Sequence, residues 1–585
     1  MHSFKEEVLK SAQKYPDSIA IQDQSEEINY REFKKKIDLV SGFLIKNKIK
    51  KNDAVVVFGE RSSDLIISIY SINFIGAIYV PISIQTPIER INNIINDCNP
   101  KIILADKIKN TEKLVPLNNK IKIVTTEIIL RSKNDSLFQY PKLTNKEFSY
   151  IIYTSGTTGL PKGILIDNCS LVSKIKLLQK LYPLRKNDCF LFKTNIMFDV
   201  SLTEVFGFIF NGRTLVVLPE SNEKDINYVI DHIRINKVTH VNFVPTIFSV
   251  FIETLEMNLN TKEKLTLKFV FLAGEELDVN LINKALELMP NTKFVNLYGP
   301  TESTIYVSAN NIKSKVETKL VPIGRPLKGS KFYVIKDNML QPIGIIGELY
   351  IGGEGLAVKY LNKIDLTNEF FIQNPLGIKE RVYKTGDLVH WNNNGELTFI
   401  GRKDSQVKIN GYRVELSEIE FALKQHPLVR KAIVIFNKEK NMIIAYYNSE
   451  TEILRNELEQ HLSKTLMKYS LPHYYILLKT IPVTNSGKID KSMLPSPFIK
   501  PRKIINVPSS NLENMIRELW SEVLDIDAET IGNNDSFFLL GGDSIKATKF
   551  ILKFKKLYEV DIPFLAIIEK ETITNLADFI DKKDH

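Results

Sequence analysis

The stretch Tyr153–Gly163 reads YTSGTTGLPKG and combines three glycines, four serine or threonine hydroxyls and a lysine. Backbone N–H groups next to Gly156 and Gly159 can approach phosphate oxygens closely, the hydroxyls can donate further hydrogen bonds, and Lys162 adds a positive charge. A P-loop NTPase needs a glycine directly before this lysine, where the chain has Pro161. The stretch therefore predicts a polyphosphate-binding loop of another class.

The segments on both sides of this loop predict two α/β units of unequal size. Residues 1–403 alternate short β-branched runs, such as 54–58 and 214–218, with amphipathic segments of helix length. Residues 404–493 repeat this alternation on a smaller scale. We therefore expect a large α/β body followed by a small α+β lobe.

The end of the chain predicts a linker and a small helical domain. Residues 494–508 contain four prolines, which favour a stiff, extended connection. In residues 509–585, apolar residues recur at helical spacing in three segments. The run FFLLGGDSI at 537–545 places Ser544 at the start of the second segment, where a serine is either a helix cap or an exposed, reachable hydroxyl.

Composition excludes several classes of protein. The 585 residues are 44% hydrophobic and 25% charged, an ordinary globular composition for more than one domain. The uncharged stretch 65–88 is interrupted by Asn, Gly and Pro, and the N-terminus is acidic, so we expect neither a membrane span nor a secretory signal. Three unevenly spaced cysteines fit neither a disulfide framework nor a zinc site, which favours a reducing cytoplasm.

The charge is unevenly distributed along the chain. The net charge is +10, but no basic run with interleaved aromatic residues occurs, so nucleic acid is not an expected partner. Residues 509–585 contain 9 Lys and Arg against 15 Asp and Glu, a net of −6, which leaves +16 for residues 1–508. This fits either an ordinary lysine-rich surface or a basic body that attracts its acidic C-terminal domain.

Further motifs occur in a fixed order on both sides of the glycine-rich loop. They are Gly76–Pro81, Phe198–Ser201, Asn296–Glu302, Gly347–Leu349, Tyr383–Leu388, Gly401–Asp404, Gln406–Ile409 and Asn485–Asp490. Together they resemble the ordered motifs of adenylate-forming enzymes, best matched by the adenylation domains of nonribosomal peptide synthetases. The run at 537–545 resembles the phosphopantetheine attachment site of a peptidyl carrier domain, and 494–497 resembles the family's linker. The resemblance implies a mobile small lobe followed by a four-helix carrier domain.

The resemblance also implies a site for ATP and Mg²⁺. Asp387 would accept both ribose hydroxyls, Tyr298 would stack on adenine, and Asn296 would read the polar edge of the base. Glu302 would hold Mg²⁺, and Thr301 would contact phosphate. The other implied nucleotide positions are Thr154, Ser155, Gly156, Thr157, Thr158, Gly159, Lys162, Phe399 and Arg402.

Two catalytic orientations of the small lobe are implied as well. Lys488 would bridge the substrate carboxylate and the α-phosphate and stabilise the charge that develops there. Because Lys488 lies in the small lobe and most nucleotide contacts lie in the large body, the lobe must close for adenylation and turn for transfer. Asp404 resembles the hinge. Turning about it would bring the catalytic Lys408 to the site, together with Gly411, which leaves room for 4'-phosphopantetheine on Ser544.

The substrate pocket follows from the same resemblance. Asp199 would pair with the α-ammonium of an amino acid, and Lys488 is the other charged member of the pocket. The remaining positions are Val200, Thr203, Asn242, Phe271, Ala273, Leu297, Ile305 and Tyr306. Because an unpaired buried charge is costly and the aromatic members consume volume, we expect a small neutral substrate. The short list is cysteine, serine, glycine, alanine and proline.

The sequence thus predicts an acid–thiol ligase of natural-product biosynthesis that forms aminoacyl-AMP and loads its own carrier domain. The alternatives are a D-alanine or acyl ligase, which normally lacks its own acceptor serine, and a non-catalytic carrier or docking module. Expected partners are a phosphopantetheinyl transferase and separate condensation, tailoring or thioesterase proteins. Asn168, Ser83 and Asn410 depart from the family pattern, which leaves the need for an MbtH-like helper protein open.

Overall fold

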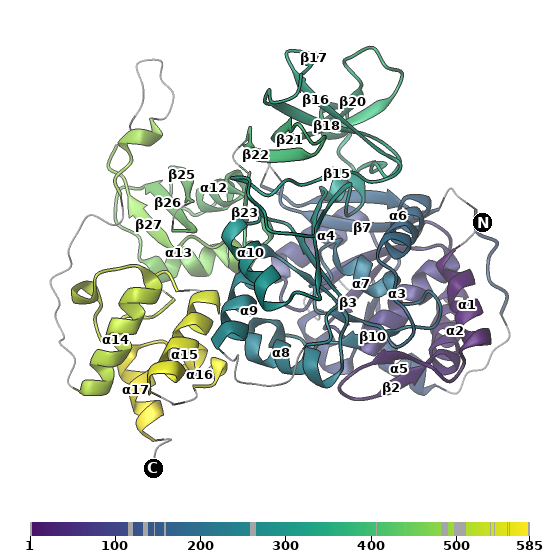
Figure 1. Cartoon of the computed structure of the whole chain (residues 1–585), viewed down its shortest axis with the longest axis horizontal. Helices are drawn as coiled ribbons and strands as arrows, with labels where there is room; N and C mark the ends of the chain where they lie inside the picture. Colours follow the sequence, from purple (N-terminus) through teal and green to yellow (C-terminus); the bar gives the residue numbers. More distant parts are fainter. Residues whose placement is uncertain are drawn as a thin grey trace.

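The structure is a computed structural model of the chain, and Figure 1 shows a large body, a small lobe and a C-terminal helical domain. It describes residues 3–114, 121–132, 138–144, 147–156, 159–257, 265–404, 406–438, 440–480, 482, 490–496, 510–538, 540–542, 544–558, 560 and 562–582.

Two mainly parallel sheets form the centre of the large body. The first has the strand order β15-β14-β13-β12-β11-β9-β10-β1-β2, and the second has the order β19-β8-β7-β4-β3-β5-β6. The strands of the first sheet are β1 (Ile19–Gln22), β2 (Glu27–Asn29), β9 (Cys189–Phe192), β10 (Thr214–Val217), β11 (His240–Phe243), β12 (Phe269–Ala273), β13 (Lys293–Tyr298), β14 (Ser308–Ile312) and β15 (Arg325–Pro326). Those of the second are β3 (Ala54–Gly59), β4 (Ile78–Ser83), β5 (Ile102–Ala105), β6 (Lys122–Thr125), β7 (Phe148–Thr154), β8 (Lys162–Asp167) and β19 (Lys359–Tyr360).

Helices cover these sheets, as a parallel sheet with apolar strands requires. They are α1 (Phe4–Lys14), α2 (Tyr30–Lys46), α3 (Ser63–Ile75), α4 (Ile88–Cys98), α5 (Thr126–Arg131), α6 (Asn168–Leu181), α7 (Ser201–Gly207), α8 (Ile226–Ile235), α9 (Pro245–Met257), α10 (Val279–Leu288) and α11 (Ile364–Phe370). The uncharged stretch 65–88 contains most of the buried helix α3 and all of the buried strand β4. Among the described residues, no helix is both long enough and apolar enough to cross a membrane.

A third sheet of the body and the small lobe follow. The third sheet contains β16 (Ser330–Lys336), β17 (Met339–Leu340), β18 (Gly347–Gly353), β20 (Phe371–Gln373), β21 (Arg381–Trp391) and β22 (Leu397–Arg402). The small lobe contains β23 (Gln406–Ile409), β24 (Tyr412–Glu415), α12 (Leu416–Lys424), β25 (Lys431–Asn437), β26 (Met442–Asn448), α13 (Arg455–Leu462) and β27 (Tyr474–Leu477). Its apolar core is separate from that of the body, in agreement with the predicted small lobe.

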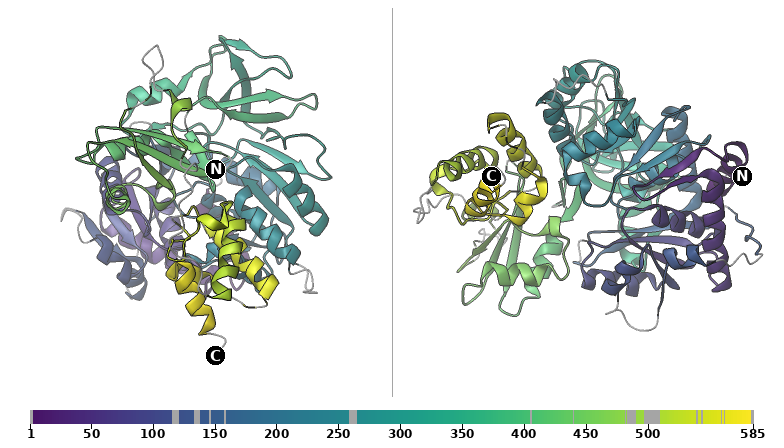
Figure 2. Two further views of the ribbon diagram at one scale, coloured as in Figure 1. Left: turned by 90° about the vertical axis from the view of Figure 1, so that its left-hand side faces the viewer. Right: turned by 90° about the horizontal axis from the view of Figure 1, so that it is seen from below.

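The C-terminal domain contains α14 (Asn511–Leu524), α15 (Ser544–Tyr558), α16 (Phe564–Glu569) and α17 (Ile573–Asp581), packed around Trp520 and Phe550. Helix α15 lies beside α9 of the body (Figures 1 and 2). Lys549 Nζ of α15 lies 3.0 Å from Glu253 Oε1, whereas Lys440 Nζ of the small lobe lies 3.3 Å from Asp525 Oδ2. In the first contact the carrier domain supplies the positive charge, and in the second it supplies the negative charge. Attraction between a basic body and an acidic C-terminal domain therefore explains only the contact of Lys440 with Asp525.

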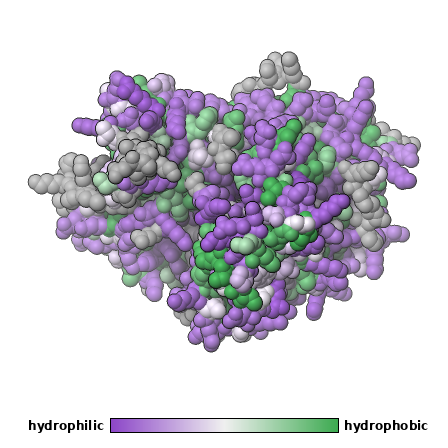
Figure 3. All heavy atoms as spheres, turned by 90° about the horizontal axis from the view of Figure 1, so that it is seen from above, coloured by the Kyte–Doolittle hydropathy of each residue, from purple (hydrophilic) through white to green (hydrophobic). Residues whose placement is uncertain are grey.

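Exposed apolar side chains gather on and after the hairpin that joins β16 and β17. They are Met339, Leu340, Ile343, Ile345 and Ile346. Strand β17 lies at the top of the molecule in Figure 1, and Figure 3, viewed from that side, shows hydrophobic side chains gathered on this face. This surface is separate from the contact between α9 and α15.

Candidate active site

A cavity of about 690 Å³ lies between the large body and the small lobe. The predicted site residues that line it are Thr154, Ser155, Asp199, Val200, Ala273, Asn296, Leu297, Tyr298, Thr301, Tyr306, Asp387, Phe399, Arg402 and Lys408. They come from β7, β12, β13, β21 and β22 of the body, from the loops that follow its strands, and from β23 of the lobe. Motifs that are far apart in the sequence therefore meet in one cleft.

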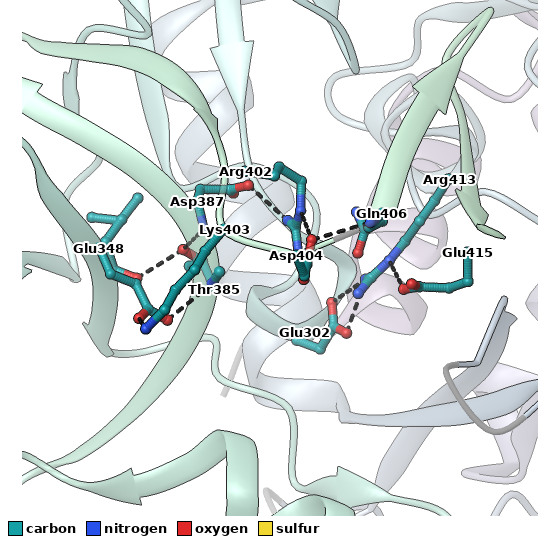
Figure 4. A network of polar contacts seen from close by, with 12 residues as sticks. Glu302, Glu348, Thr385, Asp387, Arg402, Lys403, Asp404, Gln406, Arg413 and Glu415 are labelled. Atoms are coloured by element: carbon teal, nitrogen blue, oxygen red, sulfur yellow. Dashed lines mark hydrogen bonds and ion pairs between the residues drawn. The ribbon is translucent and has the colours of Figure 1, made fainter. Parts of the chain in front are cut away.

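Asp387 on β21 lies in a polar network at this cleft (Figure 4). Its Oδ1 accepts a hydrogen bond from Arg402 Nη1 at 2.7 Å, and its Oδ2 accepts one from the Tyr298 hydroxyl. Arg402 also donates from Nε to Asp404 Oδ1 at 2.7 Å and from Nη2 to Asp404 Oδ2 at 2.5 Å. The predicted ribose ligand, adenine platform and hinge residue are thus joined in one network.

Glu302 is fully buried, and protein cations hold its carboxylate. Arg413 Nη1 lies 3.0 Å from each of its two oxygens, Lys162 Nζ lies 3.3 Å from Oε1, and the Tyr360 hydroxyl donates to Oε1 at 2.9 Å. Burial by itself raises the pKa of Glu302, but the charges of Arg413 and Lys162 outweigh it and hold the pKa well below its usual value. Glu302 is therefore an ionised carboxylate.

An ionised carboxylate suits Mg²⁺, which commonly takes one or two carboxylates together with the phosphates of its substrate. Within the described part of the chain, no cluster of three or more His, Cys, Asp or Glu could hold a metal by itself. The donor set therefore fits an ion that is bound together with ATP. Arg413 of the small lobe engages the same two oxygens, so Arg413 and Mg²⁺ would compete for Glu302.

The β23–β24 hairpin carries the small lobe into the cleft. Its turn is Asn410–Gly411, with φ of 51° and 80°, as a two-residue type I′ turn requires. Asparagine tolerates this conformation better than most residues, which accounts for Asn410 where the family pattern has arginine. The Gly411 N–H donates to Glu275 Oε1 at 2.5 Å, and a Cβ on Gly411 would lie 2.3 Å from Val244 Cγ1. The turn therefore lies directly against the body.

Further contacts hold this orientation of the lobe. Lys408 Nζ on the same hairpin lies 6.0 Å from the centroid of the Tyr298 ring. The Ser155 hydroxyl donates to the backbone oxygen of Arg413 at 3.0 Å. The structure thus has Lys408 at the cleft. The resemblance to adenylation domains implies this position of Lys408 for the transfer step.

The glycine-rich loop contacts the lobe as well. A Cβ on Gly156 would lie 2.1 Å from the Leu160 backbone oxygen, and Gly159 has φ of 80° with the Phe421 ring beside it. Both positions therefore require glycine. Lys162 on β8 is buried and points to Glu302, and burial is the main cause that lowers its pKa to about 8. Thr157 and Thr158 lie outside the described residues.

A second cavity, of about 220 Å³, adjoins both the cleft and the C-terminal domain. Its lining includes Thr548, one helical turn after Ser544, and also Val200, Ala273 and Tyr306 of the substrate pocket. Gly411 also lines it, where a side chain would meet Val244. This channel fits a slender phosphopantetheine arm attached at the start of α15. The side chain of Ser544 itself lies outside the described residues.

The predicted substrate pocket is buried and largely apolar. Asp199 is 7% exposed, its Oδ2 has no described hydrogen-bond partner, and burial is the main cause that raises its pKa to about 6. Thr203, Asn242, Phe271, Leu297 and Tyr306 line a hollow of about 20 Å³. Ile305 is buried and lines none of the three cavities. Asn242 and Tyr306 also line the second cavity, so the hollow is continuous with a larger space.

Sequence reasoning missed several residues that join the lobes. Arg413 and Glu275 are described above, and Arg90 Nη1 lies 2.7 Å from Glu418 Oε1, both side chains being 5% exposed. The type I′ pair Asn410–Gly411 was the one local signal that could have indicated the hairpin. Lys488 lies outside the described residues, so its role remains a prediction.

Family models match the three parts of the chain. The AMP-binding enzyme model matches residues 8–361, the AMP-binding enzyme C-terminal domain model matches 418–488, and the phosphopantetheine attachment site model matches 514–580. The two lobes, the cleft and the helical domain define an adenylate-forming enzyme joined to a carrier domain. The chain belongs to the AMP-binding enzymes, in the adenylation and carrier arrangement of nonribosomal peptide synthetases, which confirms the predicted resemblance.

Curated relatives and solved structures agree with this family. The chain is 35% identical over 574 residues to a linear gramicidin synthase of Brevibacillus parabrevis, covering 97% of this chain and 11% of that protein. It is 33% identical over 590 residues to gramicidin S synthase 2 of Aneurinibacillus migulanus, covering 99% and 13%. The chain thus spans a small part of these relatives.

Among solved structures, holo-PA1221, a nonribosomal peptide synthetase protein with adenylation and PCP domains, has a TM-score of 0.84 at 22% identity and covers 99% of this chain and 96% of that one. Holo-AB3403, a four-domain nonribosomal peptide synthetase bound to AMP and glycine, has a TM-score of 0.60 at 27% identity, with 100% and 43% covered. The predicted α/β body with a helical carrier domain is confirmed.

Proposed function

We propose that this chain activates an amino acid with ATP as aminoacyl-AMP and transfers the aminoacyl group to its own carrier domain, as one module of nonribosomal peptide or related biosynthesis. The observation that carries the proposal is the lining shared by the nucleotide cleft, the substrate pocket and a channel that reaches Thr548 on the carrier. Phosphopantetheine on Ser544 would supply the accepting thiol, and Mg²⁺ at Glu302 would neutralise phosphate charge.

In the adenylation step, residues of the body would bind and orient both substrates. Asp199 would hold the α-ammonium, and Asp387 would hold the ribose. A carboxylate oxygen of the amino acid forms a bond to the α-phosphorus, and the bond to the pyrophosphate oxygen breaks. Lys488 would stabilise the charge that develops on these oxygens.

The transfer step would use the orientation of the lobe that the structure has. In this orientation Arg413 supplies positive charge at Glu302, where Mg²⁺ would supply it when ATP is bound, and this contact would help to hold the β23–β24 hairpin in the cleft. The contacts of Glu275 with Gly411 and of Arg90 with Glu418 add to this orientation. The proposed hinge at Asp404 lies directly before the hairpin.

The proposed activity is tested in two stages. Pyrophosphate exchange with each amino acid reports adenylation, and intact mass of the carrier after pantetheinylation reports loading. We expect a small neutral amino acid to give both signals. Exchange fastest with tryptophan or glutamate would contradict the substrate class, whereas no exchange with any amino acid would favour a non-catalytic carrier module.

The pKa of Asp199 predicts how substrate affinity depends on pH. The ammonium needs the ionised carboxylate, and burial raises the pKa of Asp199 to about 6. Affinity should therefore be full above this value and fall as the pH drops through it, so that KM for the amino acid rises about tenfold for each pH unit below 6. Pyrophosphate exchange measured at several pH values checks this. A KM that stays constant down to pH 5 would contradict the pairing.

A substitution at the proposed hinge should separate the two half-reactions. Proline fixes φ and also restricts Lys403, so Asp404→Pro should slow loading of the carrier about tenfold or more relative to adenylation. Asp404→Ala is the matched control, because it removes the contact with Arg402 without restricting the backbone. If Asp404→Pro left the ratio of loading to pyrophosphate exchange unchanged, the hinge would lie elsewhere.

The same function requires partners that we infer from the chemistry of the site. A phosphopantetheinyl transferase must modify Ser544. Condensation, tailoring or thioesterase domains must use the loaded amino acid.

A further inference from the structure

Two buried polar atoms of the substrate pocket have no hydrogen-bond partner among the described residues, and the proposed function gives them no role. Asn242 and Tyr306 are 3% and 2% exposed, and Asn242 Oδ1 and the Tyr306 hydroxyl have no hydrogen-bond partner among the described residues. Both residues line the channel and the small hollow, and Tyr306 also lines the cleft together with Asp199. A buried polar atom without a partner costs roughly 1–3 kcal/mol, so such atoms usually meet a ligand or water.

The orientation of the Asn242 amide is fixed by its neighbours. Its Nδ2 donates to Glu204 Oε1 at 2.9 Å and to Thr203 Oγ1 at 3.1 Å. Glu204 can accept but not donate when ionised, and the Thr203 hydroxyl already donates to the backbone oxygen of Val200 at 2.8 Å. The nitrogen must therefore face these two residues, which leaves Oδ1 as an acceptor that needs a donor from elsewhere.

We propose that the substrate is a small amino acid whose side chain ends in a hydroxyl, with serine preferred, and that Asn242 and Tyr306 recognise this hydroxyl. A hydroxyl can donate to Asn242 Oδ1 and accept from the Tyr306 O–H with one oxygen atom. Alanine, glycine and proline carry no such group and leave both protein atoms unpaired. A thiol is a weaker donor, so cysteine ranks below serine. This inference rests on the proposed function and narrows its substrate class.

Kinetics of pyrophosphate exchange test the proposal. Sites that hydrogen-bond a substrate hydroxyl discriminate strongly against analogues without it, so we expect kcat/KM for serine to exceed that for alanine by about 10² or more. Exchange that is fastest with alanine, glycine or proline would overturn the inference while leaving the proposed function intact. Absence of exchange with every amino acid would instead remove the proposed function.

Tyr306→Phe gives a second test that does not depend on a damaged fold. The substitution deletes a hydroxyl that has no described partner, so the melting temperature without ligand should stay at or above that of the wild type. The ratio of kcat/KM for serine to that for alanine should fall about tenfold or more, because the serine oxygen loses a donor. Tyr182→Phe is the matched control, since this tyrosine lines the same hollow but not the channel. An unchanged ratio in Tyr306→Phe would contradict the assignment of Tyr306.

Discussion

Ser544→Ala is expected to abolish attachment of phosphopantetheine and all loading of the chain. The attachment is a phosphodiester to the serine oxygen, and alanine offers no atom that could replace it. Ser544 begins α15, and Thr548, one turn later, lines the channel to the cleft. Intact mass after treatment with a phosphopantetheinyl transferase and coenzyme A should show the mass increase in the wild type and not in Ser544→Ala.

Ser521→Ala serves as the control for this experiment. Ser521 lies on α14 of the same domain, and its hydroxyl donates to the backbone oxygen of Ile526 at 2.7 Å. This variant should still gain the mass of one phosphopantetheine group. Modification of Ser544→Ala at any other serine would show that the channel and the attachment site are unrelated.

Three residues that the sequence predicted for the nucleotide site, Asp387, Arg402 and Tyr298, lie together in the structure. Asp387 on β21 pairs in register with Arg402 on β22, and Tyr298 ends β13 at the same cleft. Strand order in such a fold places each motif in a fixed position relative to the next. All three residues belong to the large body, so the fold of the body brings them together.

The contacts of Arg413 could not be predicted in this way. Arg413 lies on β24, and its partner Glu302 lies on the short 3-10 helix Thr301–Ser303 of the body. Their meeting depends on how the small lobe is turned, which we propose differs between adenylation and transfer, and local periodicity does not determine that orientation. The same holds for Arg90 with Glu418 and for Glu275 with Gly411. The structure therefore adds contacts between the lobes that the sequence motifs could not give.

Lys488→Ala is expected to slow adenylation by about 10² to 10³, the usual loss when one stabilising contact to a developing charge is removed. A lysine that acts only in the transition state changes kcat more than KM. Pyrophosphate exchange with the preferred amino acid measures the effect. Lys491→Ala is the matched control, because Lys491 is exposed on the short helix Lys491–Met493 that follows.

If the lobe takes a different orientation for each half-reaction, as proposed, Lys488→Ala should affect adenylation and spare transfer. In the structure the β23–β24 hairpin places Lys408 at the cleft. The lining of the cleft includes no described residue of the segment around Lys488. Transfer from a chemically prepared aminoacyl-AMP should therefore survive in Lys488→Ala, since its adenylation step has been bypassed. Equal losses in exchange and in this transfer would show a general defect of the lobe, and exchange at the wild-type rate would rule out the role of Lys488.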